Sequence, residues 1–134
     1  MTLKYHTRRD YMKIIGKNPI TGLDYPDPDV IRVDDTYYMV STTMHFVPGC
    51  EILRSYDLVH WEHLSYVYER LDSTEEQRLV GEKNCYGKGM WAASLRYHKG
   101  MYYICFVAND TGKTYLYTAD NIEGPWEKRI IEGF

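Results

Sequence analysis

The stretch that decides the fold is VIRVDDTYYMV at residues 30–40, because the chain repeats it as LRYHKGMYYIC at residues 95–105. Each copy is typical of a short strand, a turn and a second, tyrosine-rich strand. The tyrosine pairs that begin at Tyr37 and Tyr102 are 65 residues apart, and so are Trp61 and Trp126. Two independent markers at one spacing indicate a structural repeat of that length.

Outward from this repeat, the pattern predicts short strands separated by turns. In the first unit strands are expected over 30–33, 36–43 and 51–54, and in the second unit over 95–97, 101–108, 114–118 and 126–131. The polar stretch 66–89 is expected to be a connecting loop with at most one helical turn at 74–79. Antiparallel meanders of about four short strands are typical of β-propeller blades. A sandwich or a jelly roll is the alternative, but neither predicts a fixed period.

The expected fold class is therefore all-β, a β-propeller of which this chain supplies about two blades. Residues 1–17 are a polar lead, 18–66 are blade one, 67–90 are the connecting loop and 91–134 are blade two. Repeat folds need more than two units to bury a core. We therefore expect the remaining blades, or self-association, to complete the structure. The recurring Trp61 and Trp126 are expected to pack between blades.

Composition, charge and cysteine spacing limit the functions that this chain can have. The chain has 134 residues and a net charge of −3, which argues against nucleic acid as a partner. It has no run of about 18 apolar residues, so no membrane partner is expected. Cys50, Cys85 and Cys105 have neither zinc-site spacing nor an even count for a disulfide framework, and no metal or cofactor is predicted. Residues 1–17 show no signal-peptide core, so a cytoplasmic location is expected.

The repeat also aligns candidate functional residues. Asp27 and Ala92 are 65 residues apart, each just before the first strand of its unit, where a propeller presents residues to its central channel. Asp27 lies between Pro26 and Pro28, which restrict the backbone on both sides. Rigid placement suits a catalytic carboxylate, although the same residues could form only a rigid turn. Trp91 is either a platform for a sugar ring or a core residue, and the loop residue His45 is either a substrate contact or merely exposed.

An ordered set of motifs adds a family resemblance. The set comprises 18–20 (NPI), 25–28 (YPDP), 37–38 (YY), 41–42 (ST), 46–49 (FVPG), 55–61 (SYDLVHW) and 91–95 (WAASL). In that order they resemble the start of a glycoside hydrolase of family 43, the β-xylosidase and α-L-arabinofuranosidase group. The resemblance runs from about residue 18 to the end, and it covers only the N-terminal portion of such an enzyme. It implies a propeller of five blades.

The resemblance implies roles for individual residues. It assigns the general base of an inverting mechanism to Asp27 and the glycone site to Trp91 and Ala92, with Met44 and His45 as loop candidates for substrate binding. The family often has Trp-Ala-Pro where this chain has WAA at 91–93. The family's general acid and the Asp that tunes it belong to later blades, so this chain is expected to lack both. Some relatives hold calcium in the channel, which nothing in this sequence supports.

The expected function is that of an inverting glycoside hydrolase acting on xylo-oligosaccharides or arabinose-substituted xylan fragments. Its expected partner is a small oligosaccharide substrate, and the 134-residue chain alone is expected to be inactive. One alternative is a non-catalytic sugar-binding or scaffold module in which the blades persist without catalysis. Another is a different five-bladed hydrolase, such as one that cleaves fructans.

Overall fold

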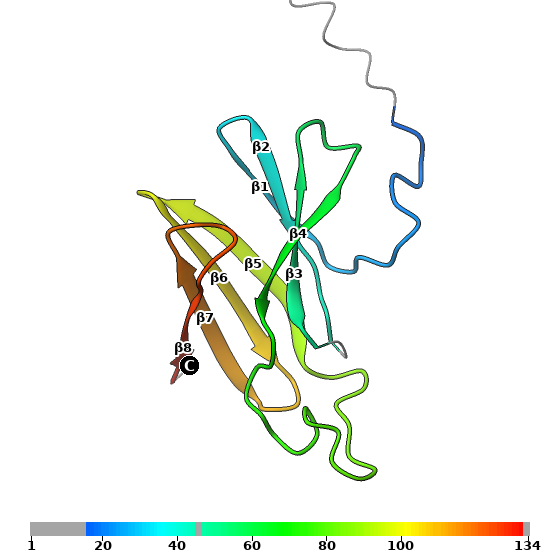
Figure 1. Ribbon diagram of the computed structural model, residues 1–134, viewed down its shortest axis with the longest axis vertical. Helices are drawn as coiled ribbons and strands as arrows, with labels where there is room; N and C mark the ends of the chain where they lie inside the picture. Colours follow the sequence, from blue (N-terminus) through cyan, green and yellow to red (C-terminus); the bar gives the residue numbers. More distant parts are fainter. Residues whose placement is uncertain (1–15, 45–46, 133–134) are drawn as a thin grey trace, which may run out of the picture.

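The computed structural model describes residues 16–44 and 47–132, and within them the chain forms two four-stranded antiparallel sheets and no helix (Figure 1). The strands of the first sheet are β1 (Asp29–Val33), β2 (Thr36–Val40), β3 (Gly49–Ser55) and β4 (Glu62–Tyr68). Those of the second are β5 (Met90–His98), β6 (Met101–Ala108), β7 (Lys113–Ala119) and β8 (Glu127–Ile131). Each sheet is a simple meander, in which strands adjacent in sequence are adjacent in space. Among the described residues, no helix is long and apolar enough to cross a membrane.

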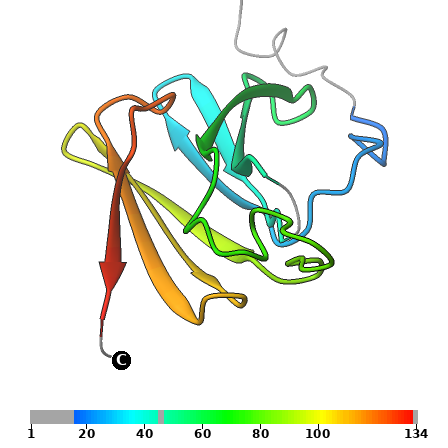
Figure 2. The same cartoon turned by 60° about the horizontal axis from the view of Figure 1, so that its bottom comes forward.

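Strand register confirms the 65-residue repeat. The first hairpin closes with Val33 opposite Thr36, and its counterpart closes with His98 opposite Met101. The two sheets lie side by side with β1 next to β5 (Figures 1 and 2). The chain thus has two consecutive blade-like units whose first strands are neighbours, as the sequence predicts.

The hydrophobic core lies between the sheets. Along β6 the side chains of Tyr102, Ile104 and Phe106 alternate toward the first sheet and are buried. The ring of Tyr68 at the end of β4 packs against Phe106, with ring centroids 6.0 Å apart, so the outer strand of one sheet reaches the core strand of the other. Burying a side chain such as Ile104 or Phe106 contributes roughly 1.5–3 kcal/mol, so these contacts favour packing of the two sheets against each other.

Hydrogen bonds to Asp29 join β1 and β5, the first strands of the two sheets. Asp29 Oδ2 accepts hydrogen bonds from Leu95 N at 2.8 Å and from Arg96 Nη1 at 2.7 Å. These bonds connect the start of β1 to the middle of β5, and they therefore fix how the two first strands lie relative to one another.

Strand β4 is the main departure from the sequence expectation. β4 crosses the boundary between blade one and the connecting loop that is expected after residue 66. A second departure is that β5 begins at Met90, inside the expected loop and well before the strand predicted at 95–97. The register shifts between Ile52 and Leu53, so that Ser65 and His63 lie opposite them and Leu64 is an extra residue. Because this bulge interrupts the alternation of side chains, β4 lacks the period of two by which strands are recognised.

The segment between β4 and β5 is anchored although it has no regular structure. The hydrogen bond from Arg78 N to Thr74 O confirms one helical turn. Gln77 Nε2 donates to Asp110 Oδ2 at 2.6 Å, and Lys128 Nζ donates to Leu71 O at 2.6 Å. The segment therefore rests on the second sheet, at the end where β5 begins (Figure 1).

The two recurring tryptophans differ in role. Trp126 is partly buried and packs against the core, as expected. Trp61 instead belongs to its own turn, where its indole N–H donates to Leu58 O at 3.2 Å. Among the described residues the expectation that Trp61 packs between blades is not met, because Trp61 is not one of the side chains that pack against the core between the two sheets.

Candidate active site

Both sheets begin with the same irregularity. In the first sheet Thr42 N donates to Pro26 O at 3.0 Å, whereas regular pairing starts with Asp29 opposite Val40. Two residues, 27 and 28, therefore lie opposite one, which is the arrangement of a β-bulge. A bulge at a strand end redirects a side chain, and here the redirected side chain belongs to Asp27.

The second sheet repeats this bulge one period later. Trp91 is opposite Val107 and Ser94 is opposite Cys105, which leaves residues 92 and 93 opposite one residue. Asp27 has a φ of 48° and Ala92 a φ of 42°, both in the left-handed region. Asp tolerates this region, whereas for other residues it costs roughly 1–2 kcal/mol. Such strained residues cluster at functional sites, and these two occupy equivalent places.

Asp27 is held from two directions. Its backbone follows Pro26, whose carbonyl accepts hydrogen bonds from Thr42 N and from Ser41 Oγ at 2.6 Å. Its carboxylate is exposed, and its Oδ2 accepts a hydrogen bond from Thr42 Oγ1 at 2.9 Å. The structure therefore combines a fixed backbone, one anchored carboxylate oxygen and access from solvent.

Thr42 also joins Asp27 to the second sheet. Ala92 N donates to Thr42 Oγ1 at 2.8 Å, so one buried hydroxyl contacts both bulges. The side chain of Trp91, the residue before Ala92, is 44% exposed. The structure thus brings Asp27 and Ala92 together through Thr42 and leaves part of the Trp91 ring accessible beside them.

Met44 is close to the start of β5 through its backbone. A Cβ on Gly89 would lie 2.6 Å from Met44 O, so only glycine allows this approach. His45, the other loop candidate, lies outside the described residues. The close contact at Gly89 explains how the loop after β2 is kept beside the residues that precede Trp91.

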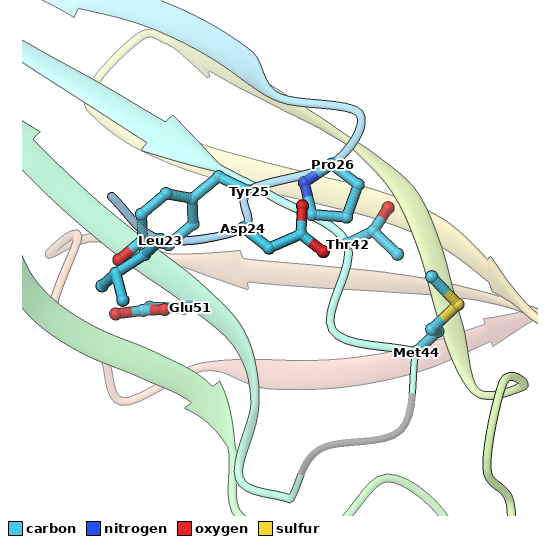
Figure 3. A pocket seen from close by; sticks show the side chains of 7 residues that line it. All are labelled: Leu23, Asp24, Tyr25, Pro26, Thr42, Met44 and Glu51. Carbon is cyan, nitrogen blue, oxygen red and sulfur yellow. The ribbon is translucent and has the colours of Figure 1, made fainter. Parts of the chain in front are cut away.

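A pocket of about 290 Å³ adjoins Asp27 on the first-sheet side. It is lined by Leu23, Asp24, Tyr25, Pro26, Thr42, Met44 and Glu51. In Figure 3 Leu23, Tyr25 and Glu51 lie toward one end and Met44 toward the other. Two of the lining residues, Pro26 and Thr42, are those that hold Asp27, so the pocket and the carboxylate share one wall.

Glu51 is the largely buried acid of this pocket. Its Oε1 lies 2.9 Å from His63 Nδ1 on the neighbouring strand. Burial, and next the nearby Glu51 carboxylate, raise the pKa of Tyr25 and of Tyr66, so both phenols stay protonated at neutral pH. The pocket therefore offers hydroxyl, carboxylate and apolar surface together, a mixture that suits a polar ligand with an apolar face.

The sequence predicts Asp27, Trp91 and Ala92 as site residues, and this stays a prediction; it assigns no role to Thr42, Asp24 or Glu51. The repeat gave no signal for Thr42, because the equivalent residue one period later is Val107. Glu51 gave no signal, since its place beside Tyr25 depends on how residues 16–28 pack on the sheet. Within residues 16–44 and 47–132, no group of three or more His, Cys, Asp or Glu side chains could hold a metal ion.

Comparison with known families gives a match along almost all of the described chain. The sequence profile described as "Glycosyl hydrolases family 43" matches residues 16–132. A β-xylosidase of Formosa agariphila is 39% identical over 114 residues, which are 85% of this chain and 19% of the relative. A non-reducing end α-L-arabinofuranosidase of Bacteroides ovatus is 37% identical over 122 residues, with 87% and 22% covered. The chain thus spans about a fifth of the length of these relatives.

Solved structures give the same result. A protein of Bacteroides eggerthii described as "Bifunctional GH43-CE" superposes with a TM-score of 0.83 and 48% identity, over 87% of this chain and 15% of that one. A xylan β-1,4-xylosidase of Bacillus halodurans superposes with a TM-score of 0.71 and 33% identity, over 88% and 23%. These neighbours are five-bladed β-propellers, and the two sheets correspond to part of one.

Proposed function

Because this chain belongs to glycosyl hydrolase family 43, we propose that it forms part of an inverting glycoside hydrolase with Asp27 as the general base. The proposed substrates are xylo-oligosaccharides or arabinose-substituted xylan fragments. The support for this substrate class is that the similar proteins include a β-xylosidase and an α-L-arabinofuranosidase. The observation that carries the proposal is the exposed Asp27 carboxylate, anchored at one oxygen beside the start of the second sheet.

The proposed reaction is a single displacement. Asp27 takes a proton from water while the water oxygen attacks the anomeric carbon, and the bond to the glycosidic oxygen breaks as that oxygen is protonated by an acid. In inverting enzymes the two carboxyl groups lie about 6.5–9.5 Å apart, which leaves room for the water. We propose that the acid belongs to a part of the propeller beyond these two blades. Trp91 and Ala92 are proposed to contact the glycone.

The test uses the complete gene product with nitrophenyl β-xyloside and nitrophenyl α-L-arabinofuranoside. Asp27→Asn is expected to lower kcat by roughly 10²–10⁴-fold, the usual contribution of a general base. Asp35→Asn is the control, because Asp35 lies in the turn between β1 and β2 and its side chain is fully exposed. Proton NMR of the first-formed sugar is expected to show the inverted anomer, and a retained anomer or an active Asp27→Asn variant would refute the proposal.

Binding and product measurements on the complete protein distinguish the proposed hydrolase from the two alternative functions. A complete protein that binds xylose or arabinose saturably but hydrolyses neither glycoside is a sugar-binding or scaffold module. Release of fructose from fructans instead of pentoses indicates the other class of five-bladed hydrolase. The 134-residue chain alone is expected to give only background hydrolysis, because the acid is proposed to lie elsewhere.

A further inference from the structure

The hydroxyl of Thr42 is the only side-chain group in the described part of the chain that bonds both bulges. It donates its proton to Asp27 Oδ2 at 2.9 Å and accepts the N–H of Ala92 at 2.8 Å. A hydroxyl has one proton to donate, so the bond to Asp27 uses it fully. The Thr42 side chain is buried, which protects both bonds from competition with water.

We propose that Thr42 is a positioning residue: its hydroxyl fixes the orientation of the Asp27 carboxylate and holds it in register with Ala92 at the start of the second sheet. This inference rests on the proposed role of Asp27 as general base. Within the described residues Oδ2 has a hydrogen-bond donor whereas no bond to Oδ1 is found. Thr42 therefore leaves Oδ1 as the oxygen that faces the attacking water.

Three contacts restrict Asp27, two through its backbone and one through its carboxylate. The bonds from Thr42 N and Ser41 Oγ to Pro26 O fix the backbone before Asp27. The bond from Thr42 Oγ1 fixes rotation of the carboxylate about the side chain. Misplacement of a reacting group by about 1 Å can cost roughly 10²-fold in rate, so this last restriction matters for turnover more than for folding.

The repeat shows that the blade itself does not need this hydroxyl. The residue equivalent to Thr42 in the second sheet is Val107, which pairs with Trp91 across the same bulge. Valine has the shape of threonine without the hydroxyl, so the bulge forms with either residue. The hydroxyl at residue 42 is therefore explained by what it contacts, Asp27 and Ala92, rather than by strand pairing.

The test compares Thr42→Val, Thr42→Ser and Asp27→Asn in the complete gene product. Thr42→Val is expected to lower kcat by roughly 10–100-fold with KM within about threefold of wild type, because the hydroxyl bonds the carboxylate of the base itself, whereas at the glycone site it bonds only the backbone N–H of Ala92. Thr42→Ser keeps the hydroxyl and is expected to recover most of kcat. A merely structural role predicts instead that the serine variant is as impaired as the valine variant, or that kcat falls only in step with unfolding.

Thr43→Val is the matched control. Thr43 is also buried, and its Oγ1 also accepts a backbone hydrogen bond, from Cys50 N at 2.8 Å, but it has no bond to Asp27. It is expected to lower the midpoint of urea unfolding by as much as Thr42→Val while kcat stays within about threefold of wild type. If kcat is unchanged in Thr42→Val while Asp27→Asn is inactive, the positioning role of Thr42 is overturned and the proposed role of Asp27 stands. An active Asp27→Asn overturns the proposed function itself.

Discussion

At the scale of single residues, Gly89 shows how a position without a side chain shapes the site. Its φ of 83° lies in the left-handed region, and a Cβ there would approach Met44 O to 2.6 Å. The loop after β2 and the start of β5 are therefore in backbone contact. This contact and the bonds of Thr42 are two independent ties between the loop and the second sheet.

We expect Gly89→Ala to destabilise the protein by roughly 1–3 kcal/mol more than Gly87→Ala, because overpacking adds to backbone strain. Gly87 is the matched control, since its φ of 71° is also left-handed but nothing lies within 4 Å of an added Cβ. Urea unfolding at neutral pH gives the comparison. Equal losses in the two variants would show that the Met44 carbonyl moves away without cost.

The site residues differ in how far sequence could predict them. Asp27 is predictable because two prolines flank it and because the repeat aligns it with Ala92. Thr42 is not predictable from the sequence, because threonine is common in strands and because its role depends on a bulge and on contact with another sheet. The sequence predicts Met44 only as a loop candidate, and what places it is the glycine at 89 rather than its own side chain.

At the scale of elements, prediction succeeded where side chains alternate and failed where a bulge interrupts them. The strand expected at 101–108 is β6 with the same bounds, because its side chains alternate without interruption. Strand β4 and the first half of β5 were missed, and each has a register shift. A shift of one residue exchanges the two faces of a strand, so these segments show no constant period even though their backbones pair.

The connecting segment is attached by charged groups as well as by the buried Leu71. Asp72 Oδ2 accepts hydrogen bonds from Lys113 Nζ at 2.7 Å and from Tyr115 OH at 3.1 Å. The hydrogen bond from Lys113, followed by that from Tyr115, lowers the pKa of Asp72 against the opposing effect of burial. The folded state therefore binds the proton of Asp72 less tightly than the unfolded chain does.

We expect Asp72→Asn to lower the free energy of unfolding at pH 7 by about 1 kcal/mol, since a hydrogen-bonded charge pair is lost. Because the folded pKa is depressed, the contribution of Asp72 is present above its unfolded pKa of about 3.9 and disappears as pH falls through the folded value. The difference between wild type and variant should thus shrink below pH 4. The midpoints of urea unfolding of both proteins, measured from pH 7 to pH 3, give this difference in stability. A difference that stays constant over this range would contradict the lowered pKa of Asp72.

At the scale of the whole molecule, two blades leave one sheet face without a partner. The side chains of Tyr102, Ile104 and Phe106 point to the first sheet, so those of Tyr103, Cys105 and Val107 alternate to the opposite face. Val107 is 46% exposed. Strand β8 is moreover an edge, with four of its five residues exposed (Figure 2). Exposed apolar faces and unpaired edges both promote association.

We expect the isolated 134-residue chain to self-associate through this face, and Val107→Lys to shift it toward monomer by placing a charge there. Val80→Lys is the matched control, because Val80 is 44% exposed but lies in the connecting segment, away from β6. Light scattering over a range of concentrations gives the mass of each variant. If both lysine variants dissociate equally, net charge rather than the sheet face governs association. If the wild-type chain is monomeric at every concentration, the uncovered face does not drive association, and these two blades need no third to remain in solution.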